Sequence, residues 1–473
     1  MRILVIYAQP VFWSMGEGRG AAIFTRLPEA MALRGHEVRV CLPTIRANAG
    51  AGRDTAGFRE TVPPAIPVNS GATSDTAGLA ETLLPAIQAN PGVPKNDLGL
   101  TPALPLADPY HGFLLHHFPA RRGFVPSADL PLVPRLRDRL DCWLRFQRWG
   151  ERAAGSLAAA FPPDLVLGMG HYEAPVARRV ARRLGVPNVT RLFGNTLSLT
   201  LRSPHRFCAN FPEVIALCTP ADLVILNDDG ASGEAVARRL RVPRDRFIHL
   251  RNGVDFARFR PGPPSAELRQ KLGIPDGRFM LMTGTRLAPE KKLERAIVGL
   301  RDLIALGVDA VLVLPGAGPE RTRLETEARA AGMADRVLFP GPVRQEEMAE
   351  WYRTADIFLS LLDRTNAANP VFEAMACGCQ VVALDAGTTR AVVRDGETGV
   401  VLPFHELPCL GPILRDLLLN AERRRRMGAA AAVAIPTLVM NLCERLDYEA
   451  RLVEDVGMRR AERALLASNA VSG

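Results

Sequence analysis

The sequence predicts an α/β protein with two doubly wound domains that face a cleft, followed by C-terminal helices. Apolar, strand-like runs alternate with helical patterns along most of the chain, and glycine-rich turns follow several of these runs. A proline-rich stretch at residues 260–265 separates two such series. Because strands that alternate with helices pair in parallel, each series is expected to form its own parallel sheet.

The composition is typical of a folded protein with a positive net charge. Of the 473 residues, 47% are hydrophobic and 23% are charged, which argues against extensive disorder. The 59 Lys and Arg residues outnumber the 50 Asp and Glu residues, and only four of the basic residues are lysines. Coding bias with a solvated surface and an anionic partner are both compatible with this balance.

Several classes of protein are not expected. No apolar run approaches the roughly 18 residues that cross a bilayer, and the first apolar run is too short for a secretory signal, so we expect a cytoplasmic protein. The eight cysteines form no Cys-x2-Cys pair, which argues against zinc sites and disulfide frameworks. Aromatic and basic residues do not interleave as in a nucleic-acid-binding module.

The first domain is expected to span residues 1–258. It opens with an apolar run at residues 3–7, a glycine-rich loop that contains Gly18 and Gly20, and a helical pattern that ends at Gly35. This is the order of a βαβ unit. The glycine loop should therefore lie beyond the carboxyl end of the first strand, where parallel sheets bind their ligands.

Two segments of the first domain depart from this alternation. Residues 44–110 are rich in Pro, Gly, Ala, Thr and Asn without periodicity, and they are predicted to be a long insertion. Residues 135–158 follow a helical pattern in which Trp and Phe stand among Arg. Such a helix either packs its aromatic side chains on a core or lies on a membrane surface, and the second alternative implies peripheral membrane contact.

A linker at residues 259–270 is expected to join the first domain to a second one at residues 271–420. The remaining residues, 421–473, have a helical pattern with a predicted break at Pro436. Strands of the second domain are predicted at residues 279–283, 311–314, 337–339, 356–361 and 380–384. Two sheets joined in this way leave a cleft between them, which is the usual place for a ligand.

Two cations directly follow the first strand of the second domain. Arg286 and Lys291 come after Gly284, just past the predicted carboxyl end of that strand. A planar Arg fork and a compact Lys charge together suit a diphosphate. The alternative is that both are solvated loop charges.

A short helix is predicted after the fourth strand of this domain. Asn369 suits the N-cap, Pro370 the first helical position, and Gly378 the exit. The backbone N–H groups from Asn369 to Val371 would then face the cleft and, with the helix dipole, favour phosphate or sugar hydroxyls. Glu373 follows one turn later, where a carboxylate can accept hydrogen bonds from the two vicinal hydroxyls of a ribose.

A histidine follows a strand of the first domain. His171 stands in a glycine-containing turn after the apolar run at residues 164–167, and Glu173 comes shortly after it. At a strand end, a histidine can act as a proton shuttle. A loop histidine without a catalytic role is the alternative, and Glu173 is a lesser candidate.

Taken together, these segments resemble the retaining glycosyltransferases of family 4, which have the GT-B fold with two Rossmann-like domains. The matching pieces occur in family order along nearly the whole chain: the N-terminal glycine loop and residues 34–38, 252–255, 286–291, 337–341, 373–378 and 395–399. Each piece is moderately specific, whereas the ordered set is a strong signal. The resemblance implies an acceptor-side first domain, a nucleotide-sugar-binding second domain, and C-terminal helices that pack back toward the first domain.

The resemblance also assigns roles to individual residues. Arg286 and Lys291 would bind the donor diphosphate, and Glu373 would bind the ribose. The segment from Val337 to Phe339 would hold the base, and the N-terminal glycine loop would border the sugar and the pyrophosphate.

Some positions depart from the family pattern. The family usually has a second carboxylate eight residues before the matched glutamate, and Thr365 stands there. Counted from the preceding strand, Asp363 would supply that acid, with Asn366 and Asn369 nearby. Arg390 stands where the family has a glutamate in the turn after the fifth strand.

The resemblance implies that a hexose-type sugar moves from a UDP- or GDP-linked donor to an acceptor hydroxyl, with lipid-linked molecules among the candidate acceptors. His171 lies near the place where family members have a histidine that contacts the donor sugar. No metal and no cofactor are expected, because no Asp-x-Asp pair stands at a strand end. The alternatives are a nucleotide-sugar epimerase of the same fold and a non-catalytic protein that binds nucleotide sugars.

Overall fold

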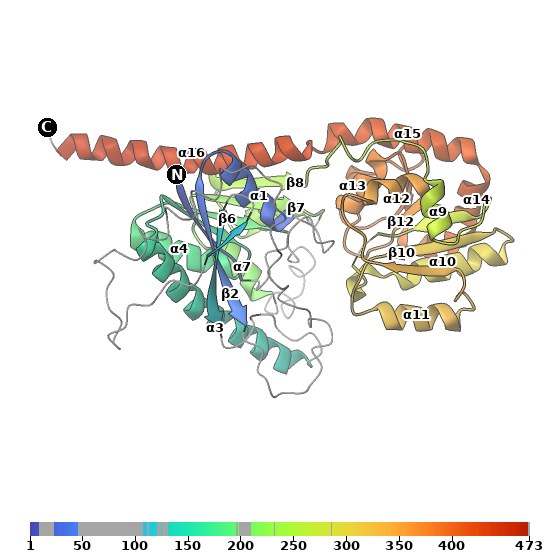
Figure 1. The fold of residues 1–473 in the computed structure, drawn as a ribbon, viewed down its shortest axis with the longest axis horizontal. Coiled ribbons are helices and arrows are strands. Elements are labelled where there is room, and N and C mark those ends of the chain that lie inside the picture. Colours follow the sequence, from blue (N-terminus) through green and yellow to red (C-terminus); the bar gives the residue numbers. More distant parts are fainter. Residues whose placement is uncertain are drawn as a thin grey trace, which may run out of the picture.

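The computed structural model describes residues 1–8, 23–45, 107–110, 113–120, 124, 131–194, 197, 210–230, 232–284 and 286–471. Within these residues, two α/β domains lie side by side, and the last helix extends from the second domain along the first (Figure 1). Gly18 and Gly20, together with the rest of the predicted N-terminal glycine loop, lie outside the described residues.

The first domain contains an eight-stranded sheet in the order β3-β4-β2-β1-β5-β6-β7-β8. Its strands are β1 (Arg2–Ile6), β2 (Glu37–Ile45), β3 (Ala107–Tyr110), β4 (Phe113–Ala120), β5 (Leu165–Met169), β6 (Asn188–Leu192), β7 (Leu223–Asp228) and β8 (Phe247–Arg251). All neighbouring pairs are parallel except β3 and β4. The strand order reverses between β1 and β5, so the carboxyl ends of these two strands form the switch point of the sheet.

Helices cover both faces of this sheet. They are α1 (Ile23–Leu33), α3 (Leu132–Ala160), α4 (Glu173–Leu184), α7 (Phe211–Cys218) and α8 (Gly233–Arg239). Strand β1 shows why both faces need cover. Ile3 and Val5 belong to one hydrophobic cluster, whereas Leu4 and Ile6 belong to another, because successive side chains of a strand point to opposite faces.

Helix α3 turns its aromatic side chains toward the protein. Phe146 is fully buried, with its ring centroid 5.2 Å from that of Phe124, and Trp143 packs edge-on against Phe211. The outer side of the helix exposes Leu140 and Leu144 instead. The aromatic residues of the predicted basic helix therefore serve core packing. Within the described part of the chain, none of the helices combines the length and the apolar content that crossing a membrane requires.

The predicted insertion begins and ends in strands of the first sheet. Strand β2 continues to Ile45, and residues 107–110 form β3 instead of loop. The following strand, β4, pairs with β2 in a parallel register from Arg39 opposite Leu114 to Ile45 opposite Ala120. Both ends of the predicted insertion thus lie in strands, because this long-range pairing supplies backbone hydrogen bonds that no local pattern reveals. Residues 46–106 lie outside the described part of the chain.

The second domain contains a six-stranded parallel sheet in the order β11-β10-β9-β12-β13-β14. Its strands are β9 (Phe279–Met282), β10 (Ala310–Pro315), β11 (Val337–Gly341), β12 (Ile357–Ser360), β13 (Gln380–Leu384) and β14 (Val400–Leu402). Its helices are α9 (Ala266–Lys271), α10 (Glu294–Ala305), α11 (Arg321–Ala330), α12 (Met348–Thr354), α13 (Asn369–Ala376) and α14 (Leu410–Leu419). The switch point of this sheet lies between β9 and β12.

The segment predicted to be a linker packs on the second domain. Phe259 and Leu268 are buried in its hydrophobic core. Ser265 caps α9 by accepting a hydrogen bond from the N–H of Leu268 (3.1 Å). The guanidinium of Arg353 donates to the carbonyl of Arg260 (2.8 Å), which holds the start of the segment.

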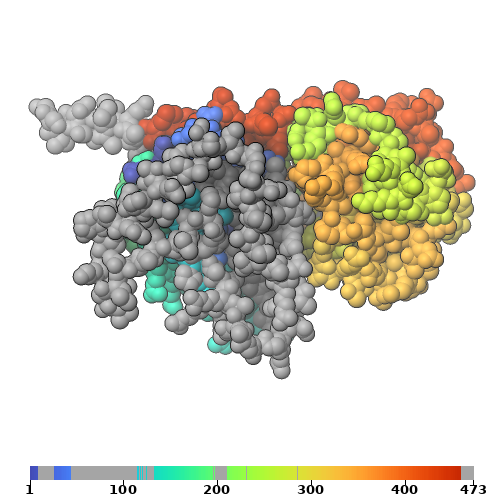
Figure 2. All heavy atoms as spheres, in the orientation of Figure 1, coloured from blue at the N-terminus to red at the C-terminus, as the bar shows by residue number. Residues whose placement is uncertain are grey.

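Two helices, α15 (Ala421–Leu438) and α16 (Leu442–Val471), form the C-terminal segment, which runs along the upper edge of both domains in Figure 2. Pro436 lies inside α15, so the break predicted at this proline was misplaced by a few residues. The helix stops where the chain meets the segment that follows β8. The N–H of Val254 donates to the carbonyl of Met440 (3.1 Å), and the N–H of Leu442 donates back to Val254 (2.9 Å).

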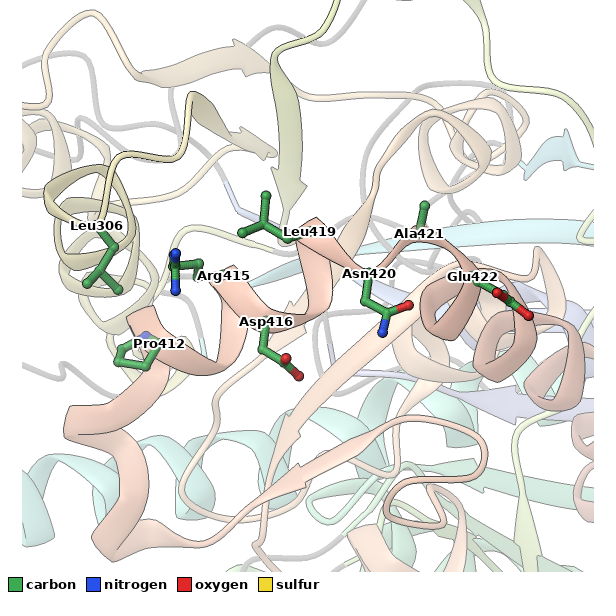
Figure 3. A pocket seen from close by; sticks show the side chains of 8 residues that line it. All are labelled: Leu306, Pro412, Arg415, Asp416, Leu419, Asn420, Ala421 and Glu422. Atoms are coloured by element: carbon green, nitrogen blue, oxygen red, sulfur yellow. The ribbon is translucent and has the colours of Figure 1, made fainter.

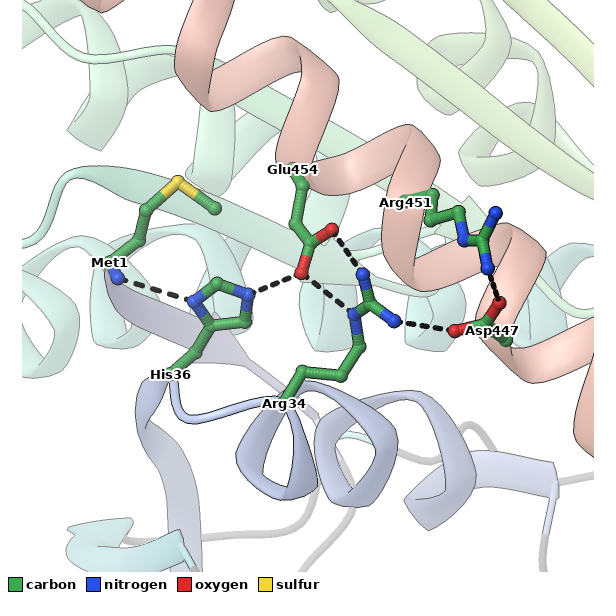
Figure 4. A network of polar contacts seen from close by, with 6 residues as sticks. All are labelled: Met1, Arg34, His36, Asp447, Arg451 and Glu454. Carbon is green, nitrogen blue, oxygen red and sulfur yellow. Dashed lines mark hydrogen bonds and ion pairs between the residues drawn. The ribbon is translucent and has the colours of Figure 1, made fainter.

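Ionic contacts dock α16 on the first domain (Figure 4). Glu454 accepts hydrogen bonds from the guanidinium of Arg34 and lies 2.7 Å from Nε2 of His36. Asp447 contacts the same arginine (2.5 Å). Arg34 and His36 follow α1, in one of the sequence segments that resemble the family. The structure therefore gives this segment a role in joining the two ends of the chain.

Candidate functional site

The loops at the carboxyl edge of the second sheet pack directly on one another. After β9, the N–H of Leu287 donates to the carbonyl of Ala317 in the loop after β10 (3.0 Å), and the N–H of Glu320 donates to Leu287 (3.1 Å). A Cβ atom at Gly318 would lie only 2.1 Å from the carbonyl oxygen of Leu287. Glycine at this position therefore allows the close packing that holds the loop carrying Arg286 and Lys291.

Three cations gather around this loop. The Arg286 side chain is largely exposed and donates to Glu290 (2.6 Å). Burial lowers the pKa of Lys291; Glu290 opposes this effect, while Arg286 and Arg364 lower the pKa further. Among the described residues, Lys291 forms no ion pair. Lys291 thus lies in the field of two arginines and one carboxylate, which leaves a surplus of positive charge at the carboxyl edge of the sheet.

Arg364 was missed by the sequence reasoning. It follows β12, whereas Lys291 follows β9, and these two strands are neighbours at the switch point. Its only signal in the sequence was a further basic residue a few positions after a strand, which by itself is weak. The structure brings it to Lys291 because parallel neighbouring strands end at the same edge of a sheet.

Asp363 is bound by a helix of its own domain. Its Oδ1 lies 2.5 Å from Nη1 of Arg295 in α10, and the same nitrogen donates to the carbonyl of Leu361 (2.7 Å). The guanidinium of Arg295 also lies over the ring of Phe404, 5.3 Å from its centroid. The Asp363 carboxylate is therefore part of an ion pair that holds the loop after β12.

Asn366 links the ends of two strands. This residue is fully buried, and its Oδ1 accepts hydrogen bonds from Oγ of Ser360 (2.7 Å) and the N–H of Leu362 (3.0 Å). Its Nδ2 donates to the carbonyls of Leu362 (3.1 Å) and Leu384 (2.8 Å). Because the amide makes four internal hydrogen bonds, Asn366 shapes the loop that precedes α13.

Helix α13 begins at Asn369, one residue earlier than the sequence predicted. Ala368 occupies the N-cap position, and no side chain caps the helix. The N-cap assignment of Asn369 was therefore wrong, because the carbonyl of Ala368 already accepts from the N–H groups of Val371 (2.9 Å) and Phe372 (3.1 Å). The Val371 side chain is fully buried in the core. By contrast, Oδ1 of Asn369 is inaccessible and has no hydrogen-bond partner among the described residues.

Glu373 is held in place by two side chains that lie far away in the sequence. Its Oε2 accepts from the Tyr352 hydroxyl (3.0 Å), and its Oε1 accepts from Nε2 of Gln345 (2.8 Å). The residue is only 8% exposed. Burial raises the pKa of Glu373 to about 7, while the hydrogen bonds from Tyr352 and Gln345 act in the opposite direction.

Gly284 lies beside this carboxylate. A Cβ atom at Gly284 would lie 3.0 Å from Cε of Met348 and 3.8 Å from the Tyr352 hydroxyl that donates to Glu373. The loop after β9 that carries Arg286 and Lys291, which we call the cationic loop, therefore starts close to Glu373. Tyr352 of α12 lies next to both. Gln345 and Tyr352 were missed by the sequence reasoning, because nothing local distinguishes them from ordinary loop and core residues.

The predicted base segment forms β11. Val337 is buried in the core of the second domain. Phe339 is partly buried, and the guanidinium of Arg321 lies 5.7 Å from its ring centroid and donates to its carbonyl (3.2 Å). Of the two predicted residues, Phe339 thus presents a ring with a neighbouring cation, whereas Val337 supports the sheet.

His171 stands in the turn after β5. Burial lowers the pKa of His171. Three contacts oppose this effect: the charge of Glu213, a hydrogen bond with the backbone of Gly194, and the charge of Asp229. Its Nε2 is inaccessible and has no hydrogen-bond partner in the described part of the molecule. Gly194 and Asp229 follow β6 and β7, so His171 belongs to a cluster at the carboxyl edge of the first sheet.

Glu173 occupies the switch point of the first sheet. It is 4% exposed, and its Oε1 accepts from the N–H of Ala8, just after β1 (2.8 Å). Burial raises the pKa of Glu173 to about 8, against the effect of its backbone hydrogen bonds. A Cβ atom at Gly170 would lie 2.4 Å from Oε2, so the glycine permits this close approach.

A surface hollow elsewhere on the second domain is a poor candidate for the site (Figure 3). It lies between Leu306, at the end of α10, and the junction of α14 with α15, where Asp416 and Asn420 line it. Leu306 precedes the amino end of β10, so this hollow is at the opposite edge of the sheet from the cationic loop. Among the described residues, no three His, Cys, Asp or Glu side chains gather in a way that could hold a metal ion.

Comparisons with known proteins agree with this geometry. The family described as "Glycosyl transferases group 1" matches residues 264–433, which contain the cationic loop and α13. A GDP-mannose-dependent alpha-mannosyltransferase of Mycolicibacterium smegmatis is 32% identical over 364 residues, which cover 74% of this chain and 86% of that protein. From the same organism, a GDP-mannose-dependent alpha-(1-6)-phosphatidylinositol monomannoside mannosyltransferase is 29% identical over 350 residues, covering 66% and 90%.

Solved structures establish the fold. Sucrose-phosphate synthase from Thermosynechococcus elongatus superposes with a TM-score of 0.63 at 16% identity, and the match covers 99% of each chain. This likeness shows that the architecture is GT-B, and it confirms the fold class predicted from the sequence.

Proposed function

Because the chain belongs to the glycosyl transferases group 1 family, we propose that it moves a hexose from a nucleotide diphosphate sugar to an acceptor hydroxyl, with retention of anomeric configuration. Two relatives are named for GDP-mannose. We therefore place GDP-linked sugars first among the donors, with UDP-linked sugars as the second choice.

The cation cluster carries this proposal. Arg286 and Arg364 both act on Lys291, and among the described residues Glu290 is the carboxylate that opposes them there, so a diphosphate would find surplus positive charge at the carboxyl edge of β9 and β12. When the bond between sugar and diphosphate breaks, negative charge grows on the departing oxygen. Fixed cations near this position stabilise the transition state more than the ground state, and such electrostatic effects usually make the largest contribution to the rate.

Glu373 supplies the second part of the donor site. Tyr352 and Gln345 fix the orientation of its carboxylate, next to Gly284 at the start of the cationic loop. A carboxylate held in this way can accept hydrogen bonds from both hydroxyls of a ribose. Phe339, with Arg321 above its ring, offers a surface on which a base can stack. The nucleotide would thus extend from β11 across β9 to β12.

The proposed reaction needs no metal ion. The charge of the leaving diphosphate would be neutralised by side chains of the protein, with Lys291 as a point charge and the two arginines as planar donors. On the first domain, we propose that the donor sugar contacts Nε2 of His171, which has no hydrogen-bond partner among the described residues. It belongs to the carboxyl-edge cluster after β5, β6 and β7.

A lipid-linked acceptor is a finer proposal. The outer side of α3 exposes Leu140 and Leu144 together with the exposed Arg137 and Arg148, so apolar and basic groups alternate on one side of the helix. This combination suits the surface of an anionic membrane. Flotation with phosphatidylglycerol vesicles tests it: replacing both arginines by Gln should abolish co-flotation, and a wild-type chain that does not float would contradict the proposal.

Ligand-observed NMR with UDP-, GDP-, ADP- and TDP-sugars tests the donor site. We expect one nucleotide class to bind, and Lys291→Ala to abolish turnover. Lys271→Ala, which removes the same charge from the exposed end of α9, serves as the matched control. Donor incubated alone distinguishes the alternatives, because an epimerase would isomerise it. Binding without any transfer in the presence of a broad panel of acceptors would favour the non-catalytic alternative.

A further inference from the structure

A glycine of the first domain makes direct contact with the loops of the donor site. Gly230 lies in the turn between β7 and α8, with φ +76°. Its N–H donates to Oδ1 of Asp228 (3.0 Å), which fixes the turn. Its carbonyl accepts from the N–H of Thr388, in the loop after β13 of the second domain (3.3 Å). Both backbone groups of this glycine are therefore engaged, one in each domain.

The contact leaves no room for a side chain. A Cβ atom at Gly230 would lie 2.0 Å from Oγ1 of Thr365 and 2.8 Å from Oγ1 of Thr388. From the other side, a Cβ atom at Gly387 would lie 2.7 Å from the carbonyl oxygen of Gly230 and 2.5 Å from that of Arg364. Two glycines with positive φ thus face each other across the boundary between the domains.

Both sides of this contact lead to candidate site residues. On the second domain, Thr365 stands between Arg364 and the buried Asn366, which links the ends of β12 and β13. The Oγ1 of Thr365 accepts a hydrogen bond from the N–H of Ala367 (3.1 Å). On the first domain, the residue before Gly230 is Asp229, whose charge acts on His171. The turn therefore lies between the two halves of the proposed site.

We propose that Gly230 is a positioning residue for the transfer reaction. Its turn rests against Thr365 and Thr388 when the cleft is closed, and this contact sets the loop that carries Arg364 and Asn366 into α13. The inference rests on the proposed function for its catalytic consequence, whereas the contact itself is independent of it.

Replacing the glycine by alanine tests the proposal. Gly230→Ala should keep the cleft open, so we expect a larger radius of gyration in small-angle X-ray scattering. The kcat should fall by roughly 10- to 100-fold, because a misplacement of about 1 Å is known to cost that much. The KM for the donor should change little, since the proposed donor contacts lie in the second domain.

Gly185→Ala is the matched control. Gly185 has a similar backbone conformation, with φ +71°, in the same domain, and no atom lies within 4 Å of a Cβ atom built there. Both variants carry the cost of alanine with positive φ, and only one carries the clash between domains. A Gly230→Ala protein that matches Gly185→Ala in both radius of gyration and kcat would overturn the proposal.

A second variant separates this contact from a general loss of structure. Thr365→Ala removes the hydroxyl that lies closest to the added methyl group, so the double variant Gly230→Ala/Thr365→Ala should recover part of the closure and of the kcat lost by Gly230→Ala alone. No recovery of either quantity would count against a direct contact. Scattering needs no substrate. If the chain transferred no sugar, the closure result would still stand or fall by itself.

Discussion

Arg34 and Glu454, which are 420 positions apart in the sequence, form an ion pair with two hydrogen bonds, 2.7 Å from Nε to Oε1 and 2.6 Å from Nη2 to Oε2 (Figure 4). His36 contacts the same carboxylate at 2.7 Å. The hydrogen bonds from Arg34, with the contribution of His36, lower the pKa of Glu454 to about 2. The pair attaches the last helix to the first βαβ unit and so links the domain that begins the chain to the segment that ends it.

Glu454→Gln should loosen this attachment in a pH-dependent way. A carboxyl whose pKa is depressed on folding contributes stability that is complete above its unfolded value and is lost as the pH falls toward 2. After allowance for solvent screening, we expect a loss of about 1–2 kcal/mol at pH 7. Calorimetry should show a Tm lower than that of the wild type at pH 7, with the difference shrinking below pH 4.5.

Glu444→Gln provides the control for this experiment, because Glu444 is exposed in the first turn of the same helix. Its Tm should stay close to that of the wild type at both pH values. A Glu454→Gln difference that is constant from pH 7 to pH 3 would show that the ion pair is not its source.

A second carboxylate of α16 should matter more. Glu449 lies 2.7 Å from Nη1 of Arg445 and 3.2 Å from Nε of Arg191, and all three side chains are at most 3% exposed. Burial lowers the pKa of Arg191 to about 10, an effect that Glu449 opposes. Glu449→Ala leaves two buried guanidinium groups without their carboxylate, which typically costs about 3–5 kcal/mol. The midpoint of urea unfolding should fall further than in Glu454→Gln, and equal losses would contradict the prediction.

Glu373→Gln should separate stability from donor binding. Burial raises the pKa of this carboxyl from 4.5 to about 7, so its stability cost is absent below pH 4.5, grows as the pH rises, and is complete above pH 7. The cost corresponds to about 3 kcal/mol. The variant should therefore have a higher Tm than the wild type at pH 8 and a similar one at pH 4.5, while its affinity for the nucleotide donor falls.

Glu350→Gln is the control for Glu373, since this exposed glutamate lies on α12 near Tyr352. Neither its Tm nor its donor affinity should change appreciably. A Glu373→Gln variant that binds the donor as tightly as the wild type in calorimetric titration would remove the ribose role from this residue.

Arg364→Ala should weaken the diphosphate site. Arg364 and Arg286 both lower the pKa of Lys291, which places all three charges in one field. Loss of one cation that stabilises a leaving group should reduce kcat by about tenfold or more. Arg415→Ala removes an equal charge from the hollow at the opposite edge of the sheet, and its kcat should be unchanged. Equal kcat values for the two variants would exclude Arg364 from the site.

The strands and the main donor segments were accessible from the sequence because they have local signatures. The strand predicted at residues 380–384 matches β13, Gln380–Leu384, since buried parallel strands read as continuous apolar runs between turn residues. Helix ends marked by glycine were equally predictable from the sequence. Gly378 has φ +75° where the sequence predicts the end of a helix.

Residues that act through distant partners were not accessible. Gln345 and Tyr352 orient Glu373 from 28 and 21 positions away, and neither belongs to a motif. The N-cap of α13 was misassigned because the competing acceptor is a backbone carbonyl, that of Ala368, which has no sequence signature. Similarly, the residue at which β2 ends depends on the pairing of β2 with β4.

By itself, the sequence determined the α/β class, the positions of most strands and the clustering of cations and a glutamate after them. These features follow from hydrophobic periodicity and from the local rule that loops at the carboxyl ends of parallel strands share one edge. The contacts between distant residues, such as Arg34 with Glu454 and Gly230 with Thr365, were visible in the folded protein alone. The reason is physical, because such contacts depend on how whole domains and helices pack, and no interaction between neighbouring residues records that packing.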